Sequence, residues 1–196
     1  MRHGGAATPP LSEAELKVQQ RGVLIAAARA VVVCASGLTL AYVCLPRFLE
    51  FPNGLAERMA FALQADVFVL LWIVFGVRQV AHVRFRSASD NRGSAYGPPS
   101  PRLAIPVAFL QNTLEQAVAA VGAHLALSTM VTGNALALIV GAVALFGLGR
   151  ICFLAGYPKG ARGRAFGVVL TVLPTLAAYG FVLILVGRTV MGSLLL

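Results

Sequence analysis

The hydrophobic and polar positions of the chain fall in long blocks. Five apolar stretches stand out, at 22–45, 59–81, 103–130, 134–155 and 165–187. Roughly 20 residues of α-helix, rising about 1.5 Å each, cross a hydrocarbon layer about 30 Å thick. Every stretch reaches that length, so the pattern predicts an all-α integral membrane protein with five transmembrane helices. The first stretch is too long for a signal-peptide core and has no clear small-residue cleavage site, which favours a retained helix.

Local signals refine the ends and connections of these helices. Ser12 and Glu15 form a capping-box pattern, which predicts a helix that begins there and continues into the first apolar stretch. The polar segment 84–101 is rich in Ser, Gly, Pro and Arg and indicates a surface loop. Only the short segment 131–134 joins the third and fourth helices, so we expect them to pack as an antiparallel hairpin. Pro174 predicts a kink in the fifth helix, which a membrane helix tolerates.

Composition and charge define the class of protein and its orientation. Hydrophobic residues make up 58% of the chain and charged residues 12%, far from the balance of a soluble domain. The basic residues behind the formal charge of +9 lie mainly at helix ends and in short loops, which favours membrane orientation over nucleic-acid binding. Ten of them flank one side of the predicted membrane and three the other. The positive-inside rule therefore predicts a cytoplasmic N-terminus and an external C-terminus.

Small residues indicate where helices approach closely. Gly141 and Gly149, with Gly147 between them, would allow such contact in the fourth helix. The three cysteines, Cys34, Cys44 and Cys152, have spacings that fit neither a disulfide framework nor a zinc site. We therefore expect the cysteines to serve in packing.

Polar side chains within the apolar stretches are costly and need a partner or a purpose. Asn112 and Glu115 are three residues apart and share one helical face. Arg150 and Tyr157 are two turns apart along one face of the next helix, and Arg164 lies at the start of the last, where an anion is favoured. The helix directions place all five in the cytoplasmic half of the membrane, where we expect them to converge on one ligand. A simpler alternative is that Glu115 and Arg150 form an ion pair that only fixes helix register.

Four other ionisable residues have simpler interpretations. Arg29 lies within the first apolar stretch, where its long side chain can extend toward the membrane surface. Asp66 has no evident partner in the sequence. His82 at a helix end and His124 in the third helix are interpreted as satisfied polar groups rather than ligands.

Two motifs give the chain a resemblance to a known family. They are QNTLEQ at 111–116, and GRICFLAGY at 149–157 followed by RAFG at 164–167. In this order and spacing they resemble the MAPEG family, the membrane-associated proteins in eicosanoid and glutathione metabolism. The resemblance covers roughly 59–187. It implies a MAPEG-like four-helix bundle at 59–196, preceded by a cytoplasmic tail at 1–21 and, at 22–58, an added transmembrane helix with its loop, similar to mattrin-like members.

The resemblance also implies an assembly, a co-substrate and an activity. Family members are homotrimers that bind glutathione between subunits near the cytoplasmic side, while lipophilic substrates enter from the bilayer. The chain would then be a glutathione transferase or peroxidase acting on lipophilic substrates. Arginines and one carboxylate suit the carboxylates, thiol and ammonium of glutathione.

Individual roles follow from motif positions. Asn112 and Glu115 would hold the glutathione backbone, Arg150 would reach a carboxylate, and Tyr157 would add a hydroxyl hydrogen bond. Arg164 matches the family arginine that holds the thiolate. The implied glutathione-binding residues are Gln111, Asn112, Glu115, Arg150, Tyr157 and Arg84, and the implied catalytic residue is Arg164.

Two departures from the family pattern leave a second function open. Ala108 stands where the well-studied eicosanoid enzymes have an arginine, and Phe153 where they have Tyr or His. One carboxylate contact would then be missing. The alternative is a non-catalytic MAPEG-fold protein that serves as a trimer scaffold, binds lipid or regulates a partner. A transporter is less favoured, because the chain has no inverted repeat or paired broken helices.

Overall fold

Five α-helices account for most of the chain in the computed structural model, which describes residues 11–194. They are α1 (Glu13–Cys44), α2 (Leu55–Arg86), α3 (Pro101–Met130), α4 (Ala137–Gly156) and α5 (Gly160–Leu194), and the described residues contain no strand. Three segments are long and apolar enough to cross a membrane: Glu13–Arg47, Leu55–Arg86 and Gly133–Gly192, the last containing both α4 and α5. The all-helical prediction is confirmed. Five crossings and the N-in orientation stay predictions.

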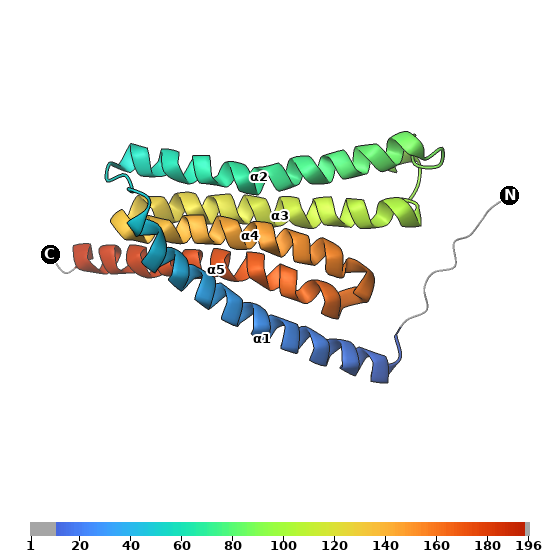
Figure 1. Cartoon of the computed structure of the whole chain (residues 1–196), viewed down its shortest axis with the longest axis horizontal. Helices are drawn as coiled ribbons and strands as arrows, with labels where there is room; N and C mark the ends of the chain where they lie inside the picture. The colour runs from blue at the N-terminus through green and yellow to red at the C-terminus, as the bar shows by residue number, and fades with distance from the viewer. Residues whose placement is uncertain (1–10, 195–196) are drawn as a thin grey trace.

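The helices form a four-helix bundle with α1 laid against one side (Figure 1). α3 packs on α2 and α5, α4 packs chiefly on α5, and α1 runs obliquely over α5 and α4. The expected packing of α3 and α4 as a hairpin is wrong, because these helices lie across the bundle from each other. A short connection makes two helices reverse direction, but side-chain and backbone fit selects the neighbour, and α4 fits α5 best.

Glycine allows α4 and α5 to touch through their backbones. A Cβ atom added to Gly149 would lie 2.8 Å from the carbonyl oxygen of Gly167, and one added to Gly156 would clash with the carbonyl of Gly163. Neither approach would be possible with a larger side chain. Gly149 thus has the predicted packing role, whereas a Cβ on Gly147 would meet only an indole ring, at 3.4 Å.

The N-terminal helix α1 attaches through small residues and through a carbonyl group that Pro174 leaves free. A Cβ atom on Gly141 would lie 2.8 Å from the Cβ of Ala41, so α1 and α4 are also in close contact. Pro174 has no N–H, and the carbonyl of Leu170 therefore lacks its helical donor. The thiol of buried Cys34 lies 4.0 Å from that oxygen, within reach of a weak S–H···O bond.

Polar caps fix two helix ends. Ser12 and Glu15 form the predicted capping box, and α1 continues without interruption from Glu13 to Cys44. At the end of α3, Arg58 of α2 donates hydrogen bonds to the carbonyls of Ser128, at 3.0 Å, and Thr129, at 3.4 Å. These carbonyls are among the last of their helix and have no helical donor of their own. Arg58 therefore fixes α2 and α3 in register.

A buried polar pair also joins α2 and α3. Nδ1 of His124 lies 2.6 Å from Oδ1 of Asp66, and the two side chains are 2% and 0% exposed. Asp66 therefore has a partner that the sequence did not reveal. Of the two ring nitrogens of His124, Nδ1 has this polar partner.

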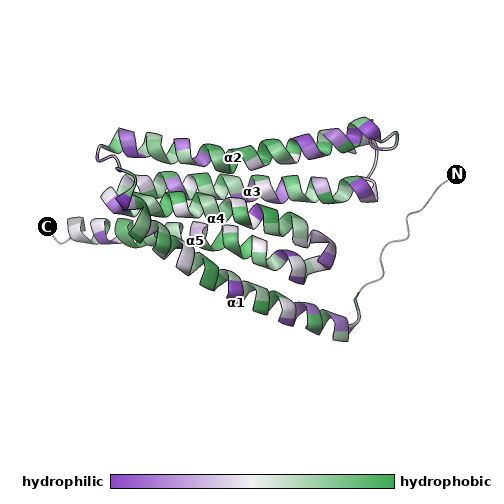
Figure 2. Cartoon of the chain, viewed as in Figure 1, coloured by the Kyte–Doolittle hydropathy of each residue, from purple (hydrophilic) through white to green (hydrophobic). Residues whose placement is uncertain are grey.

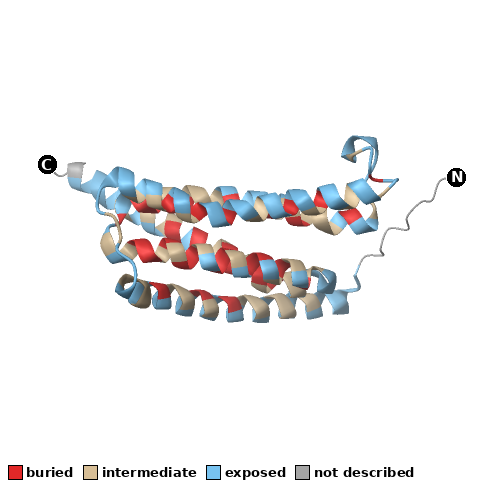
Figure 3. Cartoon of the chain, turned by 45° about the horizontal axis from the view of Figure 1, so that its top comes forward, coloured by how far each residue is buried: buried red, intermediate tan, exposed pale blue. Residues whose placement is uncertain are grey.

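Apolar side chains point outward as well as inward. Hydrophobic residues occur on the outer surfaces of all five helices (Figure 2), whereas the buried residues lie on their inner faces (Figure 3). Phe68 and Leu183, for example, are 65% and 70% exposed. Such a surface is unfavourable in water and suits contact with lipid.

Candidate functional site at the α3, α4 and α5 interface

Arg150 lies at the centre of the candidate site and is fully buried. Its Nη1 donates to Oδ1 of Asn112 at 2.7 Å, and its Nη2 donates to Oγ1 of Thr171 at 2.8 Å. Its guanidinium carbon also lies 5.4 and 5.0 Å from the ring centroids of Phe146 and Phe153, which are cation–π distances. Arg150 therefore links α3, α4 and α5 inside one chain.

Glu115 faces outward from α3, one turn beyond Asn112. Its carboxylate accepts a hydrogen bond from Nε2 of Gln111 at 3.2 Å, and both side chains are exposed. The alternative ion pair between Glu115 and Arg150 is not formed, because Arg150 donates to Asn112 and Thr171 instead. A carboxylate and an amide thus lie together on the outer surface of a mostly apolar helix.

Tyr157 and Arg164 meet at the turn between α4 and α5. The guanidinium carbon of Arg164 lies 5.1 Å from the centroid of the Tyr157 ring, and both side chains are half-buried. Phe153 packs edge-on against Tyr157, with ring centroids 5.6 Å apart. Among the described residues Arg164 has no hydrogen bond or ion pair, so its charge is available to a ligand.

Arg84 lies at a different place, beside the loop that follows α2. It lines a small polar pocket of about 100 Å³ that also includes Asp90 and Tyr96, and its Nε atom is buried without a partner. Hydrogen bonds donated by Ser100 and Ser87 hold the pKa of the Asp90 carboxyl below its usual range, and the charge of Arg84 contributes less. Asp90 thereby fixes the loop against the start of α3.

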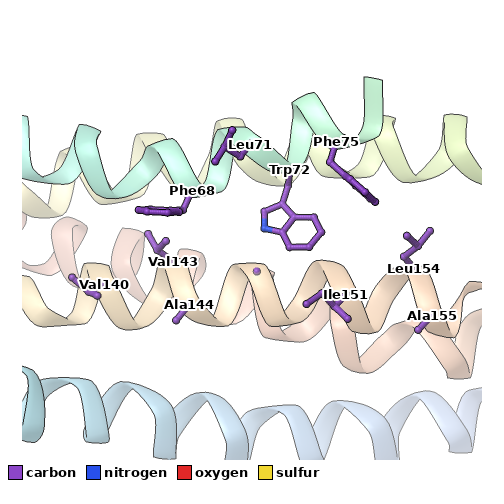
Figure 4. A pocket seen from close by; sticks show the side chains of 11 residues that line it. Phe68, Leu71, Trp72, Phe75, Val140, Val143, Ala144, Ile151, Leu154 and Ala155 are labelled. Atoms are coloured by element: carbon purple, nitrogen blue, oxygen red, sulfur yellow. The ribbon is translucent and has the colours of Figure 1, made fainter. Parts of the chain in front are cut away.

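A large apolar groove separates α2 from α4. It has a volume of about 910 Å³ and is lined by residues such as Phe68, Trp72, Ile151 and Leu154. Figure 4 shows these side chains around the space between the two helices. The groove extends along α4 to Ala155, two residues before Tyr157.

A chain of contacting aromatic rings connects this groove with Arg164. The rings follow one another edge to face or tilted, with centroids 5.6 to 6.2 Å apart. In order they are Trp72, Phe75, Phe109, Phe153 and Tyr157, and Arg164 lies over the last ring.

The structure brings some of the predicted residues together and separates others. Asn112 and Arg150 are in direct contact, but Arg150 is enclosed in the bundle while Glu115 faces outward. Within one chain these groups therefore do not surround a common ligand. Thr171 was not predicted from the sequence, although it lies seven residues after Arg164, two turns along the same helix, a spacing that places both on one face.

The long apolar helices, with apolar side chains on their outer surfaces, define a helical integral membrane protein. The model of the MAPEG family matches residues 59–184, about two thirds of the chain, and the protein belongs to this family. The match covers most of α2 and α5 and all of α3 and α4, while α1 lies outside it. Comparisons with curated proteins and with solved structures gave no match.

Proposed function

We propose that the protein is a glutathione-dependent membrane enzyme that conjugates glutathione to lipophilic electrophiles or reduces lipid hydroperoxides. The observation that carries the proposal is the guanidinium of Arg164, which lies over the Tyr157 ring at the end of the aromatic chain and has no hydrogen bond or ion pair with any described residue. The glutathione site would lie between two copies of the chain in a homotrimer near the cytoplasmic side.

Glu115 supports a site that a neighbouring chain completes. An exposed carboxylate in a membrane helix is unfavourable unless a polar or cationic group covers it. Gln111 supplies one hydrogen bond, which leaves most of the carboxylate unsatisfied. The ammonium group of glutathione would match this charge once a second chain has excluded lipid from the site.

Asn112 and Arg150 would act together in binding glutathione. Because Arg150 donates to Oδ1 of Asn112, the amide is oriented with its NH₂ group free to donate. Half-buried Asn112 would then hold a carbonyl or carboxylate of the glutathione backbone. Arg150 itself would position the amide rather than reach the ligand, which revises the direct contact implied by the resemblance.

Arg164 would provide the chemistry at the thiol. A guanidinium beside the thiol favours its ionised form and lowers its pKa, and the thiolate is the nucleophile. An ordinary thiol is only about 3% ionised at pH 7, so full ionisation raises the thiolate concentration about thirtyfold. Lower intrinsic nucleophilicity offsets part of that gain.

The groove between α2 and α4 would admit the lipophilic substrate. It is apolar along its length and reaches the residues next to Tyr157. In conjugation the thiolate would attack an electrophilic carbon of that substrate, and a carbon–sulfur bond would form as the leaving group departs. The aromatic chain would exclude water from the path between the groove and the thiolate.

The test is turnover of glutathione with 1-chloro-2,4-dinitrobenzene by the purified protein in nanodiscs, measured across pH 5.5–8.5. Wild type should show a rate that is nearly constant above pH 7. Arg164→Ala should show a rate that rises almost tenfold per pH unit, because the thiol would titrate as an ordinary one. Arg162→Ala removes a neighbouring exposed arginine and should retain the wild-type profile. No glutathione binding at millimolar concentration, or identical profiles for all three proteins, would reject the proposal.

A non-catalytic function is the second candidate, and the Arg150 network favours it. The hydrogen bonds from Arg150 to Asn112 and Thr171 stabilise one chain without any ligand, and Phe153 is buried with no group that can transfer a proton. A scaffold or lipid-binding protein would need no more than this. Turnover well above the uncatalysed rate would exclude this second candidate.

A further inference from the structure

A second polar site, which includes neither Arg150 nor Arg164, is formed by the pair Asp66 and His124. Asp66 belongs to α2 and His124 to α3, and neither takes part in the proposed glutathione chemistry. The His124 ring lines a small cavity of about 110 Å³ between α1, α3, α4 and α5. Its other lining residues are apolar and include Leu38, Ala142 and Pro174.

One nitrogen of His124 remains available inside this site. Nδ1 is occupied by the carboxylate of Asp66, at 2.6 Å. Nε2 has no hydrogen-bond partner among the described residues. The residue as a whole is only 2% exposed, but the Nε2 atom itself is not completely enclosed by protein atoms. The carboxylate fixes the orientation of the ring, as in other carboxylate–imidazole pairs.

We propose that this cavity binds a small lipophilic molecule carrying one hydroxyl group, which hydrogen-bonds to Nε2 of His124. A cavity of about 150 Å³ holds benzene, and this one is smaller, at about 110 Å³. It is open at one side, where the lining residues Ala177 and Phe181 are exposed, so a phenol-sized molecule can occupy it with part of its ring outside. A hydroxyl can both donate and accept a hydrogen bond, so it pairs with Nε2 in either tautomer of the ring. Water is a poorer occupant, because an ordered water needs two to four polar partners and the lining supplies one side chain with polar atoms.

The helix outside the family match helps to form this site. Leu38 of α1 contributes one wall, and Pro174 of α5 another. The family match begins at residue 59, so the matched segment alone would leave the cavity without its α1 wall. The added helix therefore gives this protein a binding site that is separate from the candidate glutathione site.

The experiment uses the full-length protein in detergent micelles and ¹⁹F NMR, with 4-fluorophenol as the probe and fluorobenzene as the matched probe without the hydroxyl. Micelles without protein provide the blank. We expect saturable binding of 4-fluorophenol and at least about fivefold weaker binding of fluorobenzene, since one hydrogen bond is lost. The ¹⁵N resonance of His124 Nε2 should shift on addition of 4-fluorophenol only, and His124→Gln identifies that resonance.

Cavity-filling variants locate the site. Ala142→Leu adds bulk to the α4 wall and should abolish saturable binding, whereas Ala28→Leu adds the same side chain at an exposed position of α1 and should leave binding unchanged. Leu38→Phe fills the cavity from α1 if the first variant does not fold. Equal affinity for the two probes, the absence of saturable binding, or binding that survives both fillings would overturn the proposal.

Discussion

The contact between Arg150 and Asn112 predicts a specific pattern of stabilities. Arg150→Met removes a buried guanidinium that donates to Asn112 and to Thr171. Thr171 still donates to the carbonyl of Val168, at 2.8 Å, so the newly unpaired group is the Asn112 amide. An unsatisfied polar group costs about 1–3 kcal/mol when fully buried and less at half-buried Asn112, and relief of the buried charge returns part of that cost. We expect the free energy of unfolding to fall by about 1 kcal/mol.

Removal of the other partner, in Asn112→Leu, should lower the free energy of unfolding further. Asn112→Leu leaves the buried guanidinium with Thr171 as its one hydrogen-bond acceptor among the described residues, and a hydrogen bond to a charged group is worth about 1.5–3 kcal/mol. The double variant removes both polar groups and should be no less stable than Arg150→Met. The two substitutions should therefore be coupled by about 1.5–3 kcal/mol, the cost of Asn112→Leu itself, which is the upper part of the range for contacting residues.

Reversible unfolding in mixed micelles, followed by circular dichroism without glutathione, measures these free energies. Arg162→Met is the control, because an exposed arginine away from the network should change stability by no more than about 0.5 kcal/mol. Additive effects of the two single variants would refute the enclosed network. In that case Arg150 would be free to contact a glutathione carboxylate directly, as the resemblance implies.

Three further predictions follow from packing and polar contacts. Hydrogen bonds lower the pKa of Asp90, so the ionised carboxylate stabilises the loop 87–100 above the usual Asp pKa range, and this stabilisation is lost as pH falls through the lowered pKa. Hydrogen exchange of the loop amides, corrected for the intrinsic rate, should accelerate at that low pH in wild type and already at neutral pH in Asp90→Asn. Gly156→Ala should destabilise the protein by about 1–3 kcal/mol through its clash with a carbonyl of α5, whereas Gly180→Ala, which has open space, should be neutral or slightly stabilising in thermal unfolding. Asp66→Leu should cost about 1–3 kcal/mol in the same assay by leaving Nδ1 of His124 unpaired, and an unchanged melting temperature would contradict the pairing.

The helices were predictable because their signal is local. A run of apolar residues long enough to cross a bilayer specifies a helix from composition alone, and the caps and glycines mark its ends and contacts. The capping box at Ser12 and the packing roles of Gly141 and Gly149 were found in this way. The neighbour of each helix was not predictable in this way, and the expected hairpin of α3 with α4 was wrong.

The sequence named residues for the candidate site but could not give their arrangement. Motif spacing singled out Asn112, Arg150 and Arg164, yet it could not indicate that Arg150 is enclosed while Glu115 faces outward. Which side of a helix is buried depends on what packs against it. In a membrane protein, where apolar residues cover both faces, hydrophobic periodicity gives little information on that choice.

The sequence by itself determined that the chain is a helical membrane protein with two MAPEG-like motifs, because apolar length and short motifs are properties of contiguous residues. Tertiary structure alone decided that Arg150 pairs with Asn112 and Thr171, that Asp66 pairs with His124, and that a groove lies between α2 and α4. These contacts join residues from 21 to 58 positions apart in the chain. They form only when backbone approach between helices brings particular faces together, and no local pattern encodes that approach.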